Sequence, residues 1–147
     1  MLRTQTLLSR APRHPDIHII KLLSRHHLQI PAWVHLSITF LARGAFNKLY
    51  AISTSYVFRV TLPVEPFYKT ASEVATLSYI REHTSVPVPR VIAHSSTANN
   101  ELGFEWILME RIPGVPLKNV WPEMDMETKV REVGRAMHAA APRSTFL

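Results

Sequence analysis

The chain has 147 residues, of which 46% are hydrophobic and 19% charged, with a formal net charge of +6 and no cysteine. This length suits one domain, or one lobe with an extension, and the composition excludes an intrinsically disordered chain. The lack of cysteine excludes a disulfide framework, a thiol nucleophile and a cysteine metal site, and the longest apolar run, residues 30–42, is too short to span a membrane.

Residues 1–35 are predicted to form a basic N-terminal extension. Residues 1–50 carry seven lysines and arginines against one acid, whereas residues 51–147 carry ten basic and ten acidic residues. Such a neutral body argues against a nucleic-acid partner. The first 15 residues hold three arginines and no acid, which resembles a mitochondrial presequence; the alternative is an ordinary basic N-terminus. We therefore expect a cytoplasmic protein, with a mitochondrial location as the alternative.

A short helix is predicted within this extension. Asp16 is placed to cap a helix that runs from Ile17 to about Leu28. The apolar residues toward one side of it are Ile17, Ile20 and Leu23 or Leu28.

Three strands are predicted next, at residues 35–41, 48–53 and 56–62. Thr54 and Ser55 alone separate the second strand from the third, which predicts a tight antiparallel hairpin. Pro63 and Pro66 end the third strand and force a loop.

A second helix is predicted after this loop. Thr70 and Glu73 match a capping box, with Thr70 at the N-cap, and the helix continues to about Glu82. The apolar residues at helical spacing are Val74, Leu77 and Ile80.

Two further strands are predicted at residues 90–94 and 103–111. Pro113-Gly114 then breaks the chain, and a last helix is expected to begin at Trp121-Pro122, since proline suits the first helical turn. The resulting order predicts an α+β fold in which a five-stranded antiparallel sheet packs against one helix.

Gly44, between the first two strands, is a candidate phosphate-binding residue. A glycine turn lets backbone N–H groups approach phosphate oxygens without a side chain in the way. The alternative is an ordinary turn.

Arg59 is the next candidate, because it lies in the middle of the third strand between apolar neighbours. A charge there is costly unless it is paired or faces solvent. Glu73, on the following helix, is the natural partner. The alternative is an exposed Arg59, with Glu73 serving only the capping box.

The eight histidines raise the question of a metal site. His14 and His18 are separated by Pro15, and the adjacent His26 and His27 would point apart on a helix. Since no cysteine or carboxylate cluster completes a ligand set, we predict no metal site.

The strand at 103–111 ends at a chain break, as does the hinge strand on which a kinase binds adenine. The alternative is an ordinary central strand followed by a loop, and periodicity does not separate the two.

Five blocks of the chain occur in the order of a known family. They are Gly44-Ala45-Phe46-Asn47-Lys48 and residues 56–64, 69–76, 84–92 and 100–110. Together they resemble the fungal branch of the aminoglycoside phosphotransferase / choline-kinase-like family, over roughly residues 36–140. Residues 133–140 are similar to the start of that family's helical lobe.

This resemblance implies a protein-kinase-like N-terminal lobe at residues 36–112. Residues 113–147 would then be the hinge linker and the first helix of a truncated C-terminal lobe. The implied cofactor is ATP with Mg²⁺. The residues implied to bind it are Gly44, Ala45, Phe46, Asn47 and Lys48 in the phosphate loop, Arg59 with its partner Glu73, and Met109, Glu110, Arg111 and Ile112 in the hinge.

The chain differs from the family in its aspartates, which supply the catalytic base and a metal ligand in family members. Family members continue into a helical lobe with a His-x-Asp catalytic loop and a metal-binding aspartate. Here the two aspartates are Asp16, which precedes the lobe, and Asp125, which has no histidine two residues before it. We therefore expect no catalytic residue and no metal ligand in this chain, weak or no Mg-ATP binding, and no kinase turnover.

A different class of function is a non-catalytic, partner-binding form of the kinase fold. The face that meets the helical lobe in the family would then be exposed for a protein partner. Its apolar stripe is Met126, Val130, Val133 and Met137.

Overall fold

The computed structural model describes residues 14–63 and 68–141. Its elements are α1 (Ile17–Leu28), β1 (Ile38–Arg43), β2 (Asn47–Ile52), β3 (Tyr56–Thr61), α2 (Lys69–His83), β4 (Val91–Ser95), β5 (Glu105–Glu110), α3 (Leu117–Val120), the short 3₁₀ helix η1 (Trp121–Glu123) and α4 (Met126–Ala140). The predicted five-stranded antiparallel sheet is confirmed. Within the described residues, no helix combines the length and the apolarity that crossing a membrane requires.

The strand order in the sheet is β1-β2-β3-β5-β4, so β3 is central and β1 and β4 are the edges. In the register of the sheet, Arg59 of β3 lies opposite Leu49 of β2 and Ile107 of β5. Because side chains alternate along a strand, these residues share one face of the sheet. Phe58 and Val60 point to the other face. The first strand begins later than predicted, since its pairing with β2 starts at Ile38, and it ends later because Arg43 pairs with Lys48 across a short turn.

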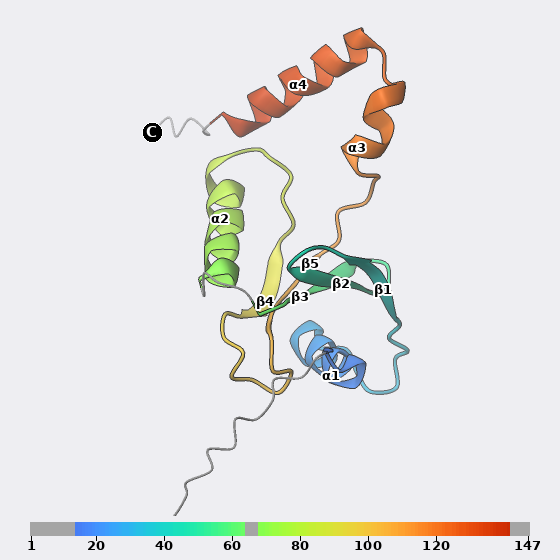
Figure 1. Ribbon diagram of the computed structural model, residues 1–147, viewed down its shortest axis with the longest axis vertical. Coiled ribbons are helices and arrows are strands. Elements are labelled where there is room, and N and C mark those ends of the chain that lie inside the picture. Colours follow the sequence, from blue (N-terminus) through green and yellow to red (C-terminus); the bar gives the residue numbers. More distant parts are fainter. Residues whose placement is uncertain (1–13, 64–67, 142–147) are drawn as a thin grey trace, which may run out of the picture.

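The helix α1 has the predicted bounds, and Asp16 caps it through a 2.7 Å hydrogen bond from the His18 N–H to Oδ1. Although the sequence analysis places this helix in an extension, α1 packs on the sheet and lies on the opposite side of it from α2 (Figure 1). Ile20 is fully buried among Phe58, Trp106 and other residues of the core. Two helices, rather than the one expected, therefore cover the sheet.

The predicted capping box at the start of α2 is wrong. The helix begins two residues earlier than that motif requires, and its N-cap is Tyr68, which makes no side-chain cap. Thr70 is instead completely buried, with its hydroxyl 3.2 Å from that of Thr61 in β3. The Thr70 hydroxyl thus contacts β3 and not the N-terminus of its own helix. Glu73 is not part of a capping box and is able to pair with a residue of the sheet.

The last helix also begins later than predicted. Trp121 and Pro122 belong to η1, and α4 starts after Asp125, whose Oδ1 accepts a 2.8 Å hydrogen bond from the Thr128 N–H. Asp125 is therefore a helix cap and not a member of the helix. The C-terminal end of α4 approaches the segment after α2, where the Ser85 N–H donates to the Ala139 carbonyl at 3.0 Å (Figure 1).

Candidate functional site

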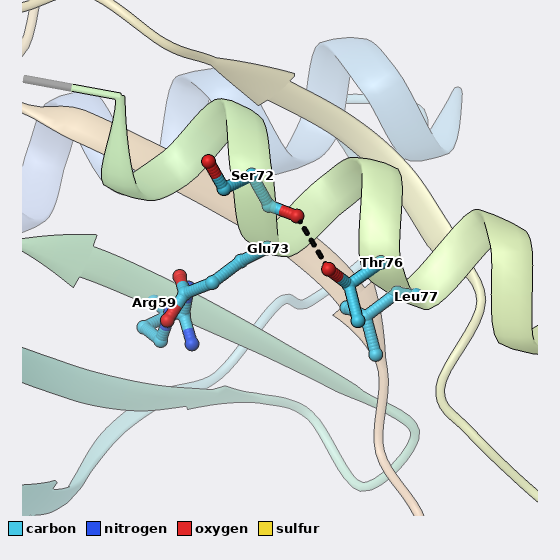
Figure 2. Close-up of a pocket in the computed structure, with 5 residues that line it drawn as sticks. All are labelled: Arg59, Ser72, Glu73, Thr76 and Leu77. Atoms are coloured by element: carbon cyan, nitrogen blue, oxygen red, sulfur yellow. Dashed lines mark hydrogen bonds and ion pairs between the residues drawn. The ribbon is translucent and has the colours of Figure 1, made fainter.

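Arg59 and Glu73 form an ion pair between the sheet and α2 (Figure 2). Residue alternation in β3 turns Arg59 toward α2, and Glu73 lies one turn into that helix. The Arg59 side chain is 15% exposed and that of Glu73 33% exposed. Burial lowers the pKa of Arg59, yet a guanidinium remains charged at any physiological pH. Arg59 is therefore paired with Glu73, and the alternative of an exposed, unpaired Arg59 is wrong.

An open cavity of about 340 Å³ adjoins this pair. Its lining residues are Arg59, Ser72, Glu73, Thr76 and Leu77 (Figure 2). Thr76 turns its hydroxyl back to the Ser72 carbonyl, at 2.8 Å, so that hydroxyl is already occupied. The Arg59 Nε is buried and meets no hydrogen-bond acceptor among the residues that the structure describes. A buried donor without a partner is uncommon and suits a ligand oxygen.

The glycine turn lies between β1 and β2. The Gly44 N–H donates to the Asn47 carbonyl at 2.9 Å, whereas those of Ala45 and Phe46 donate to no backbone carbonyl of residues 14–63 or 68–141. The φ of Gly44 is not positive, and an added Cβ would meet only the Asn47 carbonyl, at 4.0 Å. The local fold therefore does not itself require glycine here.

Lys48 is separated from the other candidate residues. It lies opposite Val60 in the register, so its side chain is on the α1 face of the sheet and not beside Arg59. The side chain is buried, and its Nζ lies 2.8 Å from His14 Nδ1. Asn47, by contrast, lies on the Arg59 face. The structure therefore brings only part of the predicted phosphate loop toward Arg59.

The predicted hinge is at the end of β5. Met109 is on the same face as Arg59. The N–H of Glu110 donates to the Arg90 carbonyl at 2.9 Å and that of Arg111 to the Ser55 carbonyl at 2.8 Å, whereas Ile112 N–H donates to no backbone carbonyl of the described residues. Of these groups, Ile112 N–H is the one left for a ligand.

A second open cavity, of about 380 Å³, adjoins this hinge. Its lining residues are Thr54, Ser55, Tyr56, Glu110, Arg111 and Pro113. The structure thus has one cavity at the ion pair and another at the hinge, and both fall within the size range of small-molecule sites.

Lys69 is a site residue that the sequence analysis missed. It is the first residue of α2, and its Nζ lies 3.4 Å from Asn47 Oδ1 and 5.2 Å from the centroid of the Phe46 ring. Burial and the charge of Arg59 lower the pKa of Lys69, and Glu105 opposes them. Its position depends on how α2 packs on the sheet, and the only signal in the sequence is a lysine at the start of the helix.

Both aspartates of the chain serve as helix caps, at α1 and at α4. In the described part of the chain, no group of three or more His, Cys, Asp or Glu side chains is arranged to hold a metal ion.

Comparison with known proteins gives a family match over most of the chain. The model of the "Phosphotransferase enzyme family" matches residues 37–143. A subtelomeric hrmA-associated cluster protein of Aspergillus fumigatus is 40% identical over 87 residues, which are 55% of this chain and 17% of that protein. The mitochondrial protein "Altered inheritance of mitochondria protein 9" of Candida tropicalis is 37% identical over 110 residues, 69% of this chain and 17% of that one. The chain thus spans 17% of the length of each relative.

Comparison with solved structures identifies the fold. The GDP and kanamycin complex of the aminoglycoside phosphotransferase APH(2")-IIIa superposes with a TM-score of 0.65 at 15% identity, covering 84% of this chain and 40% of that structure. At this identity the likeness establishes the kinase-like fold of the lobe.

Proposed function

Because the chain belongs to the phosphotransferase enzyme family, we propose that residues 36–112 form the nucleotide-binding lobe of a small-molecule phosphotransferase. The observation that carries the proposal is the ion pair of Arg59 and Glu73 beside an open cavity. In kinases, a cation on the third strand and a glutamate on the following helix hold the nucleotide phosphates. The neighbour with bound GDP supports a nucleotide in this fold.

The residues of this chain would divide the binding as follows. Arg59 presents its unpaired Nε to a phosphate oxygen while Glu73 holds the guanidinium in place. The free N–H groups of Ala45 and Phe46 donate to the phosphates, and that of Ile112 to the base. The bound nucleotide, ATP with Mg²⁺, would supply the phosphoryl group. Lys48 contributes through its backbone alone, because its side chain lies on the other face.

We expect these 147 residues to bind nucleotide weakly and to catalyse no transfer by themselves. Phosphoryl transfer requires an acid that positions the nucleophile and others that hold metal ions. The two aspartates of the chain are both engaged in capping helices. A lobe that contacts only one side of a nucleotide also forms fewer contacts than a closed cleft.

The test is a titration of the 147-residue chain with Mg-ATP and with Mg-GTP, followed by heteronuclear NMR. Weak, millimolar binding should shift the amide signals of residues 44–47 and 112. Micromolar affinity, or transfer of labelled γ-phosphate to any acceptor, would contradict the weak, inactive lobe. No shift with either nucleotide would overturn the nucleotide site itself.

Replacing Gly44 with alanine separates binding from folding. The free energy of unfolding should change by less than about 0.5 kcal/mol, because the backbone and the space at Gly44 both accept a Cβ. ATP affinity should fall about fivefold, because the methyl group would come between the turn amides and the phosphates.

The matched control for this prediction is Gly134→Ala in α4, where an added Cβ meets nothing within 4 Å. It should raise stability slightly, since alanine is the better helix former, and leave ATP affinity unchanged. Equal ATP affinity in Gly44→Ala and the wild type, measured by NMR titration, would remove the turn from the site.

The partner-binding alternative rests on α4. Met126, Val130, Val133 and Met137 are all exposed along this helix, and the first three of them line an open cavity of about 410 Å³. Contiguous apolar surface of this kind is typical of interaction sites. Sedimentation showing a monodisperse monomer at high concentration would count against this alternative.

A mitochondrial location is supported by the name of the Candida tropicalis relative and by the acid-free, arginine-containing first 15 residues. A fluorescent protein fused after Leu147 should then coincide with a mitochondrial marker. Diffuse fluorescence throughout the cell would favour the cytoplasm.

A further inference from the structure

Lys69 joins the start of α2 to the glycine turn. Its Nζ reaches across to Asn47 Oδ1, at 3.4 Å, and lies over the ring of Phe46, at 5.2 Å from its centroid. Phe46 is one of the two turn residues whose N–H groups donate to no backbone carbonyl of the described residues, and Asn47 directly follows it. The ammonium of Lys69 is therefore next to the part of the turn that is expected to face phosphate.

The contacts of Lys69 are weak for a positive charge. One is a long hydrogen bond to a neutral amide, and the other is an exposed aromatic ring. Among the described residues, Lys69 forms no ion pair with a carboxylate. A cation with such partners loses little when a more strongly charged ligand replaces them.

The charges around Lys69 include a second cation. The positive charge of Arg59 disfavours the charged form of Lys69 and so lowers the pKa of that lysine. Glu73 is already committed to Arg59. Glu105 attracts Lys69, but its Oε2 is buried and meets no donor in the described part of the chain. Two neighbouring cations can both bind a polyanion, which lowers their mutual repulsion.

From this arrangement we propose that Lys69 is a second phosphate-binding cation. Its ammonium would give up its contacts with Asn47 and Phe46 and would bind, together with Arg59, the phosphate chain of a nucleoside di- or triphosphate. This inference rests on the proposed function, since it assumes that the Arg59 face receives a nucleotide. Lysine suits the role, because its ammonium is a compact point charge on a flexible stem that is able to follow the phosphates.

The test compares Lys69→Met and Lys69→Arg with the wild type, titrating each 147-residue chain with Mg-ATP and with adenosine under NMR. Lys69→Met should lower ATP affinity about fivefold to tenfold and leave adenosine affinity unchanged, because only the phosphates contact the ammonium. Lys69→Arg should retain most of the ATP affinity. Adenosine affinity distinguishes the two roles of Lys69. If Lys69 only maintained the structure, its replacement would lower adenosine affinity as well as ATP affinity.

Lys129→Met is the matched control, since Lys129 Nζ also lies over an aromatic ring, 5.5 Å from the centroid of Trp121, but on the far helices. It should leave both affinities unchanged. If Lys69→Met binds ATP as the wild type does, or loses ATP and adenosine affinity equally, the inference is wrong and the nucleotide site stands. If the wild type binds no nucleotide, the proposed function fails and this inference fails with it.

Discussion

Replacing Arg59 with methionine is expected to lower the affinity of the chain for Mg-ATP by about 10- to 100-fold, the range given by one lost charge-assisted hydrogen-bonding group. Methionine keeps the volume of the side-chain stem, so the packing of β3 should survive. The guanidinium, however, holds Nε, a buried donor that meets no acceptor among the described residues. Because the wild-type affinity is expected to be weak, the loss should appear as absent amide shifts at millimolar ATP.

The control for Arg59→Met is Arg135→Met. Arg135 also forms an ion pair, 3.1 Å from Glu132, but it is exposed and belongs to α4, which lies apart from the sheet (Figure 1). This substitution should leave nucleotide affinity unchanged, and an exposed pair of this kind contributes little to stability. Wild-type ATP affinity in Arg59→Met would show that nucleotide, if bound, is not held by the ion pair.

Replacing Ile20 with alanine is expected to lower the free energy of unfolding by about 2–5 kcal/mol, the usual cost of truncating a buried isoleucine. Ile20 is completely buried in the core that α1 forms with the sheet. Since small domains are stable by only about 5–15 kcal/mol, this change should bring the lobe close to unfolding at room temperature. Equilibrium unfolding in urea measures it.

Ile17→Ala is the matched control for Ile20→Ala, because Ile17 is the same residue type in the same helix but is 44% exposed. It should cost less than about 1 kcal/mol. Equal, small losses at both positions would mean that α1 is an appendage, as the division at residue 35 predicts. A large loss at Ile20 alone makes α1 part of the folded lobe.

Local signals account for most of the elements that were predicted correctly. An aspartate before an apolar run specified the start of α1, and a two-residue gap between apolar strands predicted the hairpin of β2 and β3. These features depend on neighbours in the chain, and the chain alone determines them. The ordered blocks also predicted the family, which the comparisons confirmed.

Local signals failed where a distant residue competed for the same group. Thr70 matches a capping motif, but its hydroxyl bonds Thr61 across the space between helix and sheet. Lys48 follows Asn47 in the chain, yet the register of β2 against β3 turns its side chain to the α1 face. The role of each residue depended on a register or a packing contact that no short stretch of sequence contains.

The sequence by itself determined the order of helices and strands, the family, and the residue types of the candidate site, because propensity, capping and turn chemistry act over a few residues. Only the tertiary structure decided which of these residues meet. In the folded chain, Arg59 pairs with Glu73 and Lys69 contacts the glycine turn. The side chain of Lys48 lies on the face opposite Arg59, and Ile20 is buried between α1 and the sheet. The physical reason is that side-chain neighbours across a sheet are set by strand register and by helix docking, which are satisfied for the whole core at once.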